Sequence, residues 1–362
     1  MARLGLGSGW DCVFANDFDA LKTATYRSNF DDGHLRQGDV WAISPADLPG
    51  GADLAWASSP CQDVSLAGAR AGLGGARSSA FWGFWRLIEA LDDQGRAPRT
   101  IVLENVAGLF SSAGGADFAA IGQAFVARGY DFGALELNAS DFLPQSRARA
   151  FVIATRAEAS GLISSTPSPH ASAAVRRAAA QLPDALKSHW LWWRLGAPRP
   201  RNTTLADLLE PDAAVAWRSD AQTLALLDQM SPLHRERLRV AAARGERVAA
   251  AVYRRVRGAG ADKVQRAELR LDGVAGCLRT PGGGSSRQLL VVLDHGRARS
   301  RWLTPREGAR LMGLPEDYRL PARATAAWQV IGDGVAVPVV RRLADQILEP
   351  LLAGARAIAA AG

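Results

Sequence analysis

The order of apolar and polar positions divides the first 156 residues into short strand-like runs and longer helical segments. Compact apolar runs that are bounded by turn-forming residues are typical of buried strands. Apolar residues that recur every three to four positions are typical of amphipathic helices. These patterns predict helices at 79–93 and 117–130, and strands at 12–16, 54–58, 100–105, 133–139 and 150–155.

The alternation of strands and helices sets the expected fold class. Strands separated by helices of this length are typical of an α/β fold, in which helices cover both faces of a mostly parallel sheet. The last two predicted strands have no helical pattern between them. We therefore expect an antiparallel pair of strands at the end of this series.

Beyond Arg156 the pattern loses its regularity. The segment 164–172 has the Ser- and Pro-rich composition of a linker. The arginine-rich region that follows shows no sustained period and predicts no particular fold. Helices are expected again within 337–361 and at 302–318, where Thr304 and Glu307 have the spacing of a capping box.

Composition excludes several classes of protein. The 362 residues, 48% of them hydrophobic, are enough for two domains, but no apolar run is long enough to span a membrane. The N-terminus has no signal-peptide core, so we expect a soluble intracellular protein. Cys12, Cys61 and Cys277 are too widely spaced for a disulfide framework or a zinc site, and the histidines are scattered, so no metal is expected. Cys12 and Cys277 are expected to be buried.

Positive charge is concentrated in one part of the chain. Residues 235–301 contain sixteen basic and six acidic residues, a net charge of +10, although the whole chain carries only +7. A basic segment on a nearly neutral body is typical of a protein that binds a phosphate backbone. A solvated arginine-rich helix would give the same composition, so charge alone leaves both interpretations open.

Candidate chemistry gathers at the ends of the predicted strands. Cys61 follows the strand at 54–58, and Glu104 ends the strand at 100–105. Arg147 and Arg149 precede the last strand and are two residues apart, so both point to one side of an extended segment. Because ligands of α/β sheets bind at the carboxyl ends of parallel strands, we expect these side chains at one rim. A thiolate, a carboxyl group and arginines suit conjugate addition to a heteroaromatic ring.

Four motifs carry a resemblance to a known family. The sequences SSPCQ, ENV, QSRAR and GDGVAVPV occur in this order, and a basic insertion separates the third from the fourth. Together they resemble the motifs of the bacterial DNA (cytosine-5)-methyltransferases. Three further segments are similar to the family's catalytic loop, target-recognition region and following helix; they are 64–82, 272–288 and 301–318.

The resemblance implies a Rossmann-like, S-adenosylmethionine-dependent methyltransferase fold with a smaller, irregular target-recognition domain. The catalytic domain is then expected at 1–160, the recognition domain at 161–325, and a segment returning to the catalytic domain at 326–362. The implied cofactor is S-adenosyl-L-methionine and the implied partner is double-stranded DNA. We expect a cytoplasmic, nucleoid-associated monomer. It could serve a restriction–modification system without binding its endonuclease.

The family's catalytic roles carry over to four residues here. Cys61 would attack carbon 6 of a cytosine flipped out of the duplex, and Glu104 would hold ring nitrogen 3 and the exocyclic amine. Arg149 would hold the carbonyl oxygen, and Arg147 would orient Glu104 or a phosphate. Carbon 5 would then accept the methyl group.

The binding roles implied by the resemblance fall on two further sets of residues. Those expected to bind the cofactor are Asp17, Phe18, Asp39, Val40, Pro60, Asp333 and Val335. Those expected to bind DNA are Gln62, Ser65, Arg70, Arg77, Arg279, Thr280, Gly283, Ser285, Ser286 and Arg287.

The sequence departs from the family pattern at two places. The family's first strand and its glycine-rich Phe-x-Gly-x-Gly-Gly loop have no counterpart before Asp17, and Gly5, Gly7 and Gly9 are expected in the first helix and its exit turn. Such a chain would leave unpaired strand edges in the sheet. A start assigned too far downstream is favoured over a degraded chain. The second departure is Asp333, which stands where the family has Asn.

Two alternatives to a DNA methyltransferase remain at this point. One is a non-catalytic, sequence-selective DNA-binding protein derived from such an enzyme. The other is a tRNA cytosine-5 methyltransferase, although the long basic insertion favours duplex DNA.

Overall fold

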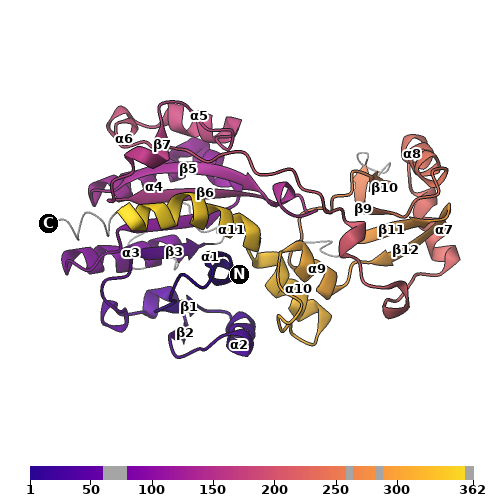
Figure 1. The fold of residues 1–362 in the computed structure, drawn as a ribbon, viewed down its shortest axis with the longest axis horizontal. Coiled ribbons are helices and arrows are strands. Elements are labelled where there is room, and N and C mark those ends of the chain that lie inside the picture. Colours follow the sequence, from indigo (N-terminus) through magenta and orange to yellow (C-terminus); the bar gives the residue numbers. More distant parts are fainter. Residues whose placement is uncertain (60–79, 258–263, 282–287, 355–362) are drawn as a thin grey trace. The chain divides into compact units, whose positions relative to one another are not determined.

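The computed structural model describes residues 1–59, 80–257, 264–281 and 288–354 (Figure 1). Its contacts divide the chain into two compact units. The smaller unit comprises Met1–Ala2, Ala139–Arg147 and Arg199–Pro338, and the larger unit comprises Arg3–Asn138, Ala148–Pro198 and Val339–Gly362. These divisions fall at different positions from the domain limits of 160 and 325 expected from sequence, which stay a prediction.

The larger unit contains a four-stranded sheet with the order β3-β4-β6-β5. β3 and β4 are parallel, whereas β6 is antiparallel to both β4 and β5. The α/β fold class and the antiparallel pair expected from sequence are therefore confirmed. The strands are β3 (Leu54–Ser58), β4 (Thr100–Asn105), β5 (Asp131–Asn138) and β6 (Ala148–Thr155).

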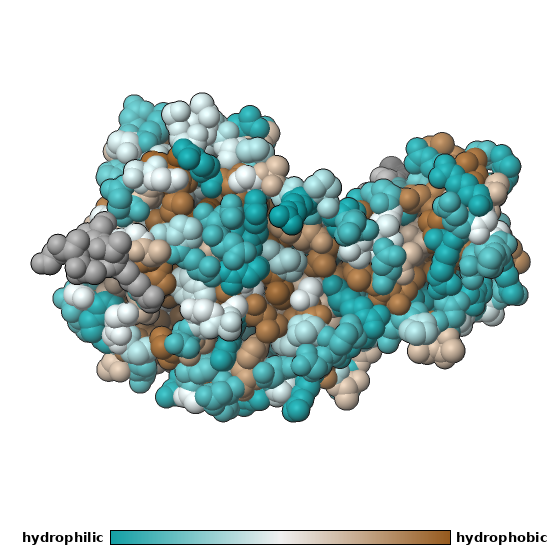
Figure 2. Space-filling model, viewed as in Figure 1, coloured by the Kyte–Doolittle hydropathy of each residue, from teal (hydrophilic) through white to brown (hydrophobic). Residues whose placement is uncertain are grey.

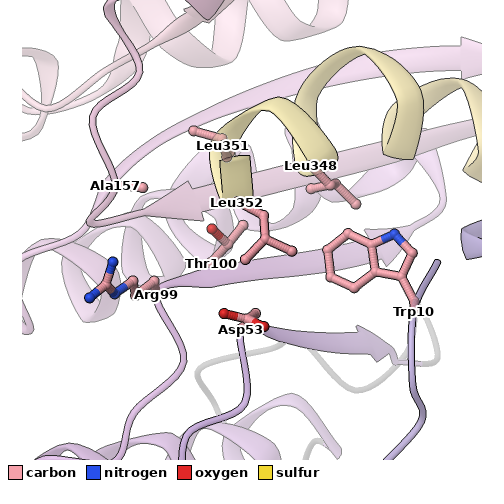
Figure 3. A pocket seen from close by; sticks show the side chains of 8 residues that line it. All are labelled: Trp10, Asp53, Arg99, Thr100, Ala157, Leu348, Leu351 and Leu352. Atoms are coloured by element: carbon pink, nitrogen blue, oxygen red, sulfur yellow. The ribbon is translucent and has the colours of Figure 1, made fainter. Parts of the chain in front are cut away.

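Helices cover both faces of this sheet. On one face, Phe81 of α3, Phe118 of α4 and Val175 of α5 share a buried core with Ile101 and Leu103 of β4. On the other face, Leu352 of the C-terminal helical segment points toward Thr100 (Figure 3). The helices of this unit are α2 (Ala20–Asn29), α3 (Ala80–Asp93), α4 (Ala116–Ala127), α5 (Ala173–Gln181), α6 (Asp184–Lys187) and α11 (Val337–Leu343), which continues through a π-helical turn at Ala344–Leu348.

A second, two-stranded sheet precedes the first along the chain. β1 (Ala15–Asp17) and β2 (Leu35–Gln37) are parallel to each other and form a separate sheet. The strand expected at 12–16 therefore begins later, at the residue that pairs with Leu35. The apolar residues of β3 are only half-buried, whereas every residue of β4 is buried. Among the described strands, β1 and β2 pair only with each other and not with the four-stranded sheet.

Glycine is required where α1 (Ala2–Leu6) ends. Gly5 lies within α1, and Gly7 follows it with a φ of 85°, a left-handed conformation that other residues rarely adopt. The expectation that these glycines belong to the first helix and its exit turn is confirmed for both.

The smaller unit is built on an antiparallel sheet with the order β10-β9-β11-β12. Leu226 of α7 and Leu238 of α8 pack with Val252, Leu289 and Val291 in a core on one face of that sheet. Sequence reasoning assigned no fold to this region because its arginines interrupt the period-2 pattern. Its elements are α7 (Asp220–Asp228), α8 (Pro232–Ala242), β9 (Val248–Arg257), β10 (Val264–Arg270), β11 (Leu289–Asp294), β12 (Arg297–Trp302), α9 (Pro305–Leu311) and α10 (Ala324–Asp333). Short strands β7 (Ile163–Ser164) and β8 (Trp192–Trp193) pair in the larger unit.

A fully buried ion pair joins β12 to α9. Arg301 donates to both carboxylate oxygens of Glu307, and neither side chain is exposed to solvent. Glu307 also accepts from the backbone N–H of Thr304 at 2.9 Å and of Glu210 at 2.8 Å. The capping box predicted at Thr304 is confirmed, and its glutamate satisfies a buried arginine as well.

Among the residues described, no helix has the length and apolar character needed to cross a membrane.

Tyr130 gives the fold a testable response to alkaline pH. Its side chain is fully buried and its hydroxyl donates to the Pro98 carbonyl at 2.6 Å, while the Arg156 guanidinium lies 4.1 Å from the ring centroid. Burial raises the pKa of Tyr130 to about 12. Because the unfolded chain ionises near pH 10, the neutral phenol stabilises the fold below pH 10, and this contribution is lost as the pH rises through 12.

We expect the stability advantage of the natural chain over Tyr130→Phe to shrink by about 1 kcal/mol between pH 9 and pH 11. Urea unfolding of both proteins at each pH measures this difference in the free energy of unfolding. A difference that stays constant with pH would contradict the prediction.

Candidate functional site

Glu104 and Arg149 form a buried pair at the carboxyl end of β4. Arg149 Nε lies 3.1 Å from Glu104 Oε1, and the two side chains are 16% and 8% exposed. In the sheet, Glu104 is opposite Ser58 of β3 on one side and Phe151 of β6 on the other. Arg149 is two residues from Phe151 on the same strand, so it presents its side chain on the same face as Glu104.

Asn105, the next residue, fixes the exit of β3. Its side-chain amide donates to the backbone oxygen of Ser59 at 3.1 Å and to Ser59 Oγ at 3.3 Å. Its carbonyl oxygen accepts from the backbone N–H of Val106 at 2.8 Å. The chain therefore leaves β3 toward the Pro60-Cys61 motif from an anchored point beside Glu104. Sequence reasoning used the Glu-Asn-Val motif but missed this role of Asn105.

Several predicted site residues lie outside the described residues, so their placement is not tested. They are Pro60, Cys61, Gln62, Ser65, Arg70, Arg77, Gly283, Ser285, Ser286 and Arg287.

The two arginines of the QSRAR motif have different partners. Arg149 belongs to the larger unit, where it pairs with Glu104. Arg147 belongs to the smaller unit, is 2% exposed, and donates to the backbone oxygens of Leu278, Gly332 and Gly334. Arg147 thus contacts backbone carbonyls of its own unit, and its Nη1 also lies 3.5 Å from Cys277 Sγ.

The carboxyl ends of β1 and β2 bring two carboxylates to one edge. Asp17 ends β1, and its backbone oxygen accepts from Gly38, the residue before Asp39, at 3.1 Å. Asp39 then begins the turn that contains Val40, with its side chain accepting from the Trp41 N–H at 3.0 Å. Phe18 is 72% exposed beside them. Carboxylates can accept from ribose hydroxyls and exposed apolar side chains can cover a purine ring. These residues therefore fit the adenosine portion of a nucleoside cofactor.

Gly83 of α3 holds the turn after β2 in place. A Cβ at this position would lie 2.6 Å from Val40 Cγ1 and 3.0 Å from Trp41 Nε1, so only glycine allows the turn to approach α3 this closely. Arg86 of the same helix donates to the Ile43 carbonyl at 2.7 Å. The turn that contains Val40, the candidate adenine contact, therefore packs closely against α3.

The remaining described candidates lie in the smaller unit. Asp333 ends α10, is exposed, and accepts from Gln329 at 3.3 Å, whereas Val335 is buried. Arg279 is exposed and Thr280 is half-buried.

The expected burial of the free cysteines is wrong. Cys277 is exposed because it alternates with the buried Gly276 and Leu278 along an extended segment. Cys12 is half-exposed, since it precedes β1 rather than lying within it.

A small cavity lies at the opposite end of β4 from Glu104. It is lined by Trp10, Asp53 and Thr100 together with the C-terminal leucines (Figure 3). Its volume of about 10 Å³ is enough for one water molecule and too small for a nucleoside. Within the described ranges, no three His, Cys, Asp or Glu residues are grouped as metal ligands would be.

Comparison with known proteins identifies the family and supports the fold. The family model for the C-5 cytosine-specific DNA methylase matches residues 2–349. The match of the family model over nearly the whole chain identifies the class of protein as a methyltransferase. The chain belongs to the C-5 cytosine-specific DNA methylase family, whose members are enzymes.

Similar proteins extend over nearly the whole chain. The Type II methyltransferase M.HhaI of Haemophilus parahaemolyticus is 26% identical over 95% of this chain and 90% of its own length. The Type II methyltransferase M.NlaX of Neisseria lactamica is 25% identical over 97% and 94%.

Solved structures share the fold. The S. pombe Dnmt2 methyltransferase has a TM-score of 0.58 at 18% identity, over 97% of this chain and 94% of that one. A putative DNA modification methyltransferase encoded within an E. coli prophage has a TM-score of 0.55 at 19% identity, over 97% and 96%.

The Glu104–Arg149 pair is testable by a double-mutant cycle. Arg149→Ala should lower the free energy of unfolding by about 3 kcal/mol because it leaves a buried carboxylate without this partner. In the double variant Arg149→Ala/Glu104→Gln the loss should be smaller than the sum of the single losses by about 1–2 kcal/mol. Urea unfolding of the four proteins gives the coupling energy, and strictly additive losses would show that the pair does not interact.

Proposed function

We propose that the protein transfers the methyl group of S-adenosylmethionine to carbon 5 of a cytosine flipped out of a short duplex DNA site, through a covalent adduct with Cys61. The observation that supports this most directly is the buried Glu104–Arg149 pair beside Ser59, from which the chain runs to Cys61. The membership of the chain in the C-5 cytosine-specific DNA methylase family supplies the substrate class.

In this proposal Cys61 is the nucleophile. A free thiol has a pKa of about 8.5, so the site must favour the thiolate for attack at neutral pH. The Cys61 sulfur bonds to carbon 6 of the cytosine, and the electron pair of the 5,6 double bond makes carbon 5 nucleophilic. Carbon 5 accepts the methyl group, and S-adenosylhomocysteine is the leaving group. Carbon 5 then loses its proton to water, the double bond re-forms, and Cys61 leaves with the electron pair of its bond to carbon 6 as a thiolate. The adduct is therefore transient.

Glu104 and Arg149 hold the pyrimidine ring. Glu104 binds ring nitrogen 3 and the exocyclic amine, which stabilises the charge that develops when carbon 6 is attacked. Arg149 Nε is directed to Glu104 and its Nη1 to the Ala148 carbonyl at 3.0 Å. Within the described residues its Nη2 donates to no oxygen, so this group is assigned to the cytosine carbonyl. Flipping the base costs a few kcal/mol, which these contacts help to offset.

S-adenosylmethionine supplies the electrophilic methyl group when it is bound. Asp17 accepts from the ribose hydroxyls and Asp39 from the adenine amine, while Phe18 and Val40 pack against the adenine ring. Pro60, Asp333 and Val335 are proposed as further cofactor contacts.

DNA contacts are proposed for the arginines of the smaller unit that lack a carboxylate partner. Those that have one include Arg247, whose hydrogen bond lowers the pKa of Asp212. Figure 2 shows the mixed hydrophilic and apolar surface of the region around α8. Leu233 of this helix is exposed. The exposed arginines of this unit that form no ion pair among the described residues include Arg235, Arg237, Arg244 and Arg266.

Sequence readout is proposed for the segment after Cys277. The exposed Arg279 and the neighbouring Thr280 read base edges, together with Gly283, Ser285, Ser286 and Arg287. Gln62, Ser65, Arg70 and Arg77 are proposed to contact the DNA around the flipped base. The protein acts as a monomer in the cytoplasm, and a cognate endonuclease would share its DNA site without binding to it.

Substitution of the cysteines tests the reaction. Cys61→Ser should lower methyl transfer to unmethylated duplex DNA by at least about 10⁴-fold, because the nucleophile is lost. Cys12→Ser is the matched control and should retain activity within a few-fold. Transfer of label from tritiated S-adenosylmethionine into DNA measures each rate.

Normal activity of Cys61→Ser would refute the covalent mechanism. If the unchanged protein binds DNA but methylates none, it is a non-catalytic binder, and label in tRNA rather than DNA would assign it to RNA.

Salt dependence tests the proposed phosphate contacts. Each lost contact should reduce the slope of log Kobs against log [NaCl] by about 0.9, so Arg235→Gln/Arg237→Gln should reduce it by nearly 2. Arg239→Gln is the control, because Arg239 is 2.7 Å from Glu236 on the same helix. Fluorescence anisotropy on duplex DNA measures the slopes. An equal change in Arg235→Gln, Arg237→Gln and Arg239→Gln, each measured singly, would show only a general charge effect.

A further inference from the structure

The backbone that leads to Arg279 is held along one side by the QSRAR segment. The N–H of Ser146 donates to the Ala275 carbonyl at 2.9 Å, and the N–H of Ala275 donates to the Pro144 carbonyl at 2.8 Å. Gln145 and Ala275 thereby form a parallel bridge. Residues 275–280, here called the recognition segment, are thus attached to residues 144–146 by backbone hydrogen bonds.

The side chain of Gln145 adds a second attachment. It is fully buried, and its amide donates to the Leu311 carbonyl at 2.5 Å while its oxygen accepts from the Leu278 N–H at 3.4 Å. One amide therefore joins the recognition segment to the end of α9.

Arg147 forms the third attachment and the only charged one of this set. Its Nη1 donates to the Leu278 carbonyl at 2.8 Å, and its Nη2 donates to the Gly332 carbonyl at 2.8 Å and the Gly334 carbonyl at 2.5 Å. The planar guanidinium thus spans the recognition segment and the end of α10. Lysine has no such fork and could not hold both at once.

Gly332, near the end of α10, lies directly against the backbone of Arg279 and Thr280. A Cβ on Gly332 would lie 2.5 Å from the carbonyl carbon of Arg279 and 2.5 Å from the nitrogen of Thr280. Real Cβ atoms do not approach backbone this closely. The α10 helix and the Arg279–Thr280 peptide therefore touch through backbone alone, and any side chain at 332 would push that peptide away.

We propose that Gln145, Arg147 and Gly332 are positioning residues that together set the place of the Arg279–Thr280 peptide and thereby the base specificity of methylation. The inference rests on the proposed function, since it assigns base reading to Arg279. Arg147, expected from sequence to act at the catalytic rim, acts in this arrangement through Leu278 and Gly332. A displacement of well under 1 Å is enough to misalign a bidentate contact between arginine and a base.

Gly332→Ala is the most direct test, with Gly161→Ala as its matched control. Gly161 has no atom within 4 Å of its ideal Cβ position, so alanine there meets nothing. Methylation rates are measured on a duplex carrying the target site and on duplexes that differ from it by one base pair. We expect Gly332→Ala to lower the ratio of kcat/KM between target and variant duplexes at least tenfold and to raise KM for DNA. KM for S-adenosylmethionine should stay within twofold.

Arg147→Lys and Gln145→Glu provide the same measurement should Gly332→Ala fold poorly. Both are close to the natural side chains in length and each loses part of the attachment. A fall in kcat by the same factor on every duplex would overturn the proposal for that residue, since it indicates a catalytic role. A rise in KM for S-adenosylmethionine alone would overturn it as well.

Hydrogen exchange separates this inference from the proposed function. Amides of residues 275–280 should exchange at least tenfold faster in Gly332→Ala and Arg147→Lys than in the unchanged protein, whether or not it methylates DNA. Unchanged exchange there would overturn the positioning role. If exchange is faster in the variants but the unchanged protein labels no DNA, the positioning role is supported and the proposed function is refuted.

Discussion

The buried Glu104–Arg149 pair is the constraint on which the candidate site depends. The two charges stabilise each other at the end of the sheet, since removing one partner from a buried pair costs several kcal/mol. Parallel pairing of β3 with β4 places Ser58 opposite Glu104, and Asn105 then fixes Ser59. The same strand end thus supplies a charged pair and anchors Ser59, the last described residue before the proposed nucleophile Cys61.

The QSRAR motif contributes to both units of the chain. Arg149 binds a carboxylate in the larger unit, whereas Arg147, two residues earlier, binds three backbone carbonyls in the smaller one. A guanidinium group serves either purpose because it offers several donors in a fixed plane. Two arginines that the sequence makes equivalent are therefore distinguished by what surrounds them.

The arginines of the smaller unit also differ in role according to their surroundings. Arg301 is fully buried against Glu307 and joins β12 to α9, so it contributes to the fold. Arg235 and Arg237 are exposed on α8 without a carboxylate partner among the described residues. The net charge of the segment was visible in the sequence, but only the pairing shows which part of it is available to a polyanion.

The sequence by itself determined the α/β class, the capping box at Thr304 and the family, because these depend on local periodicity and on short motifs. Tertiary structure alone decided the sheet of the smaller unit, the exposure of Cys277 and the separate partners of Arg147 and Arg149. Arginines mask the alternation of β9 and β12, and a side chain's partner depends on segments distant along the chain. Gly332 shows the reason most clearly: its need for glycine comes from the backbone of Arg279 and Thr280, more than fifty residues earlier in the sequence.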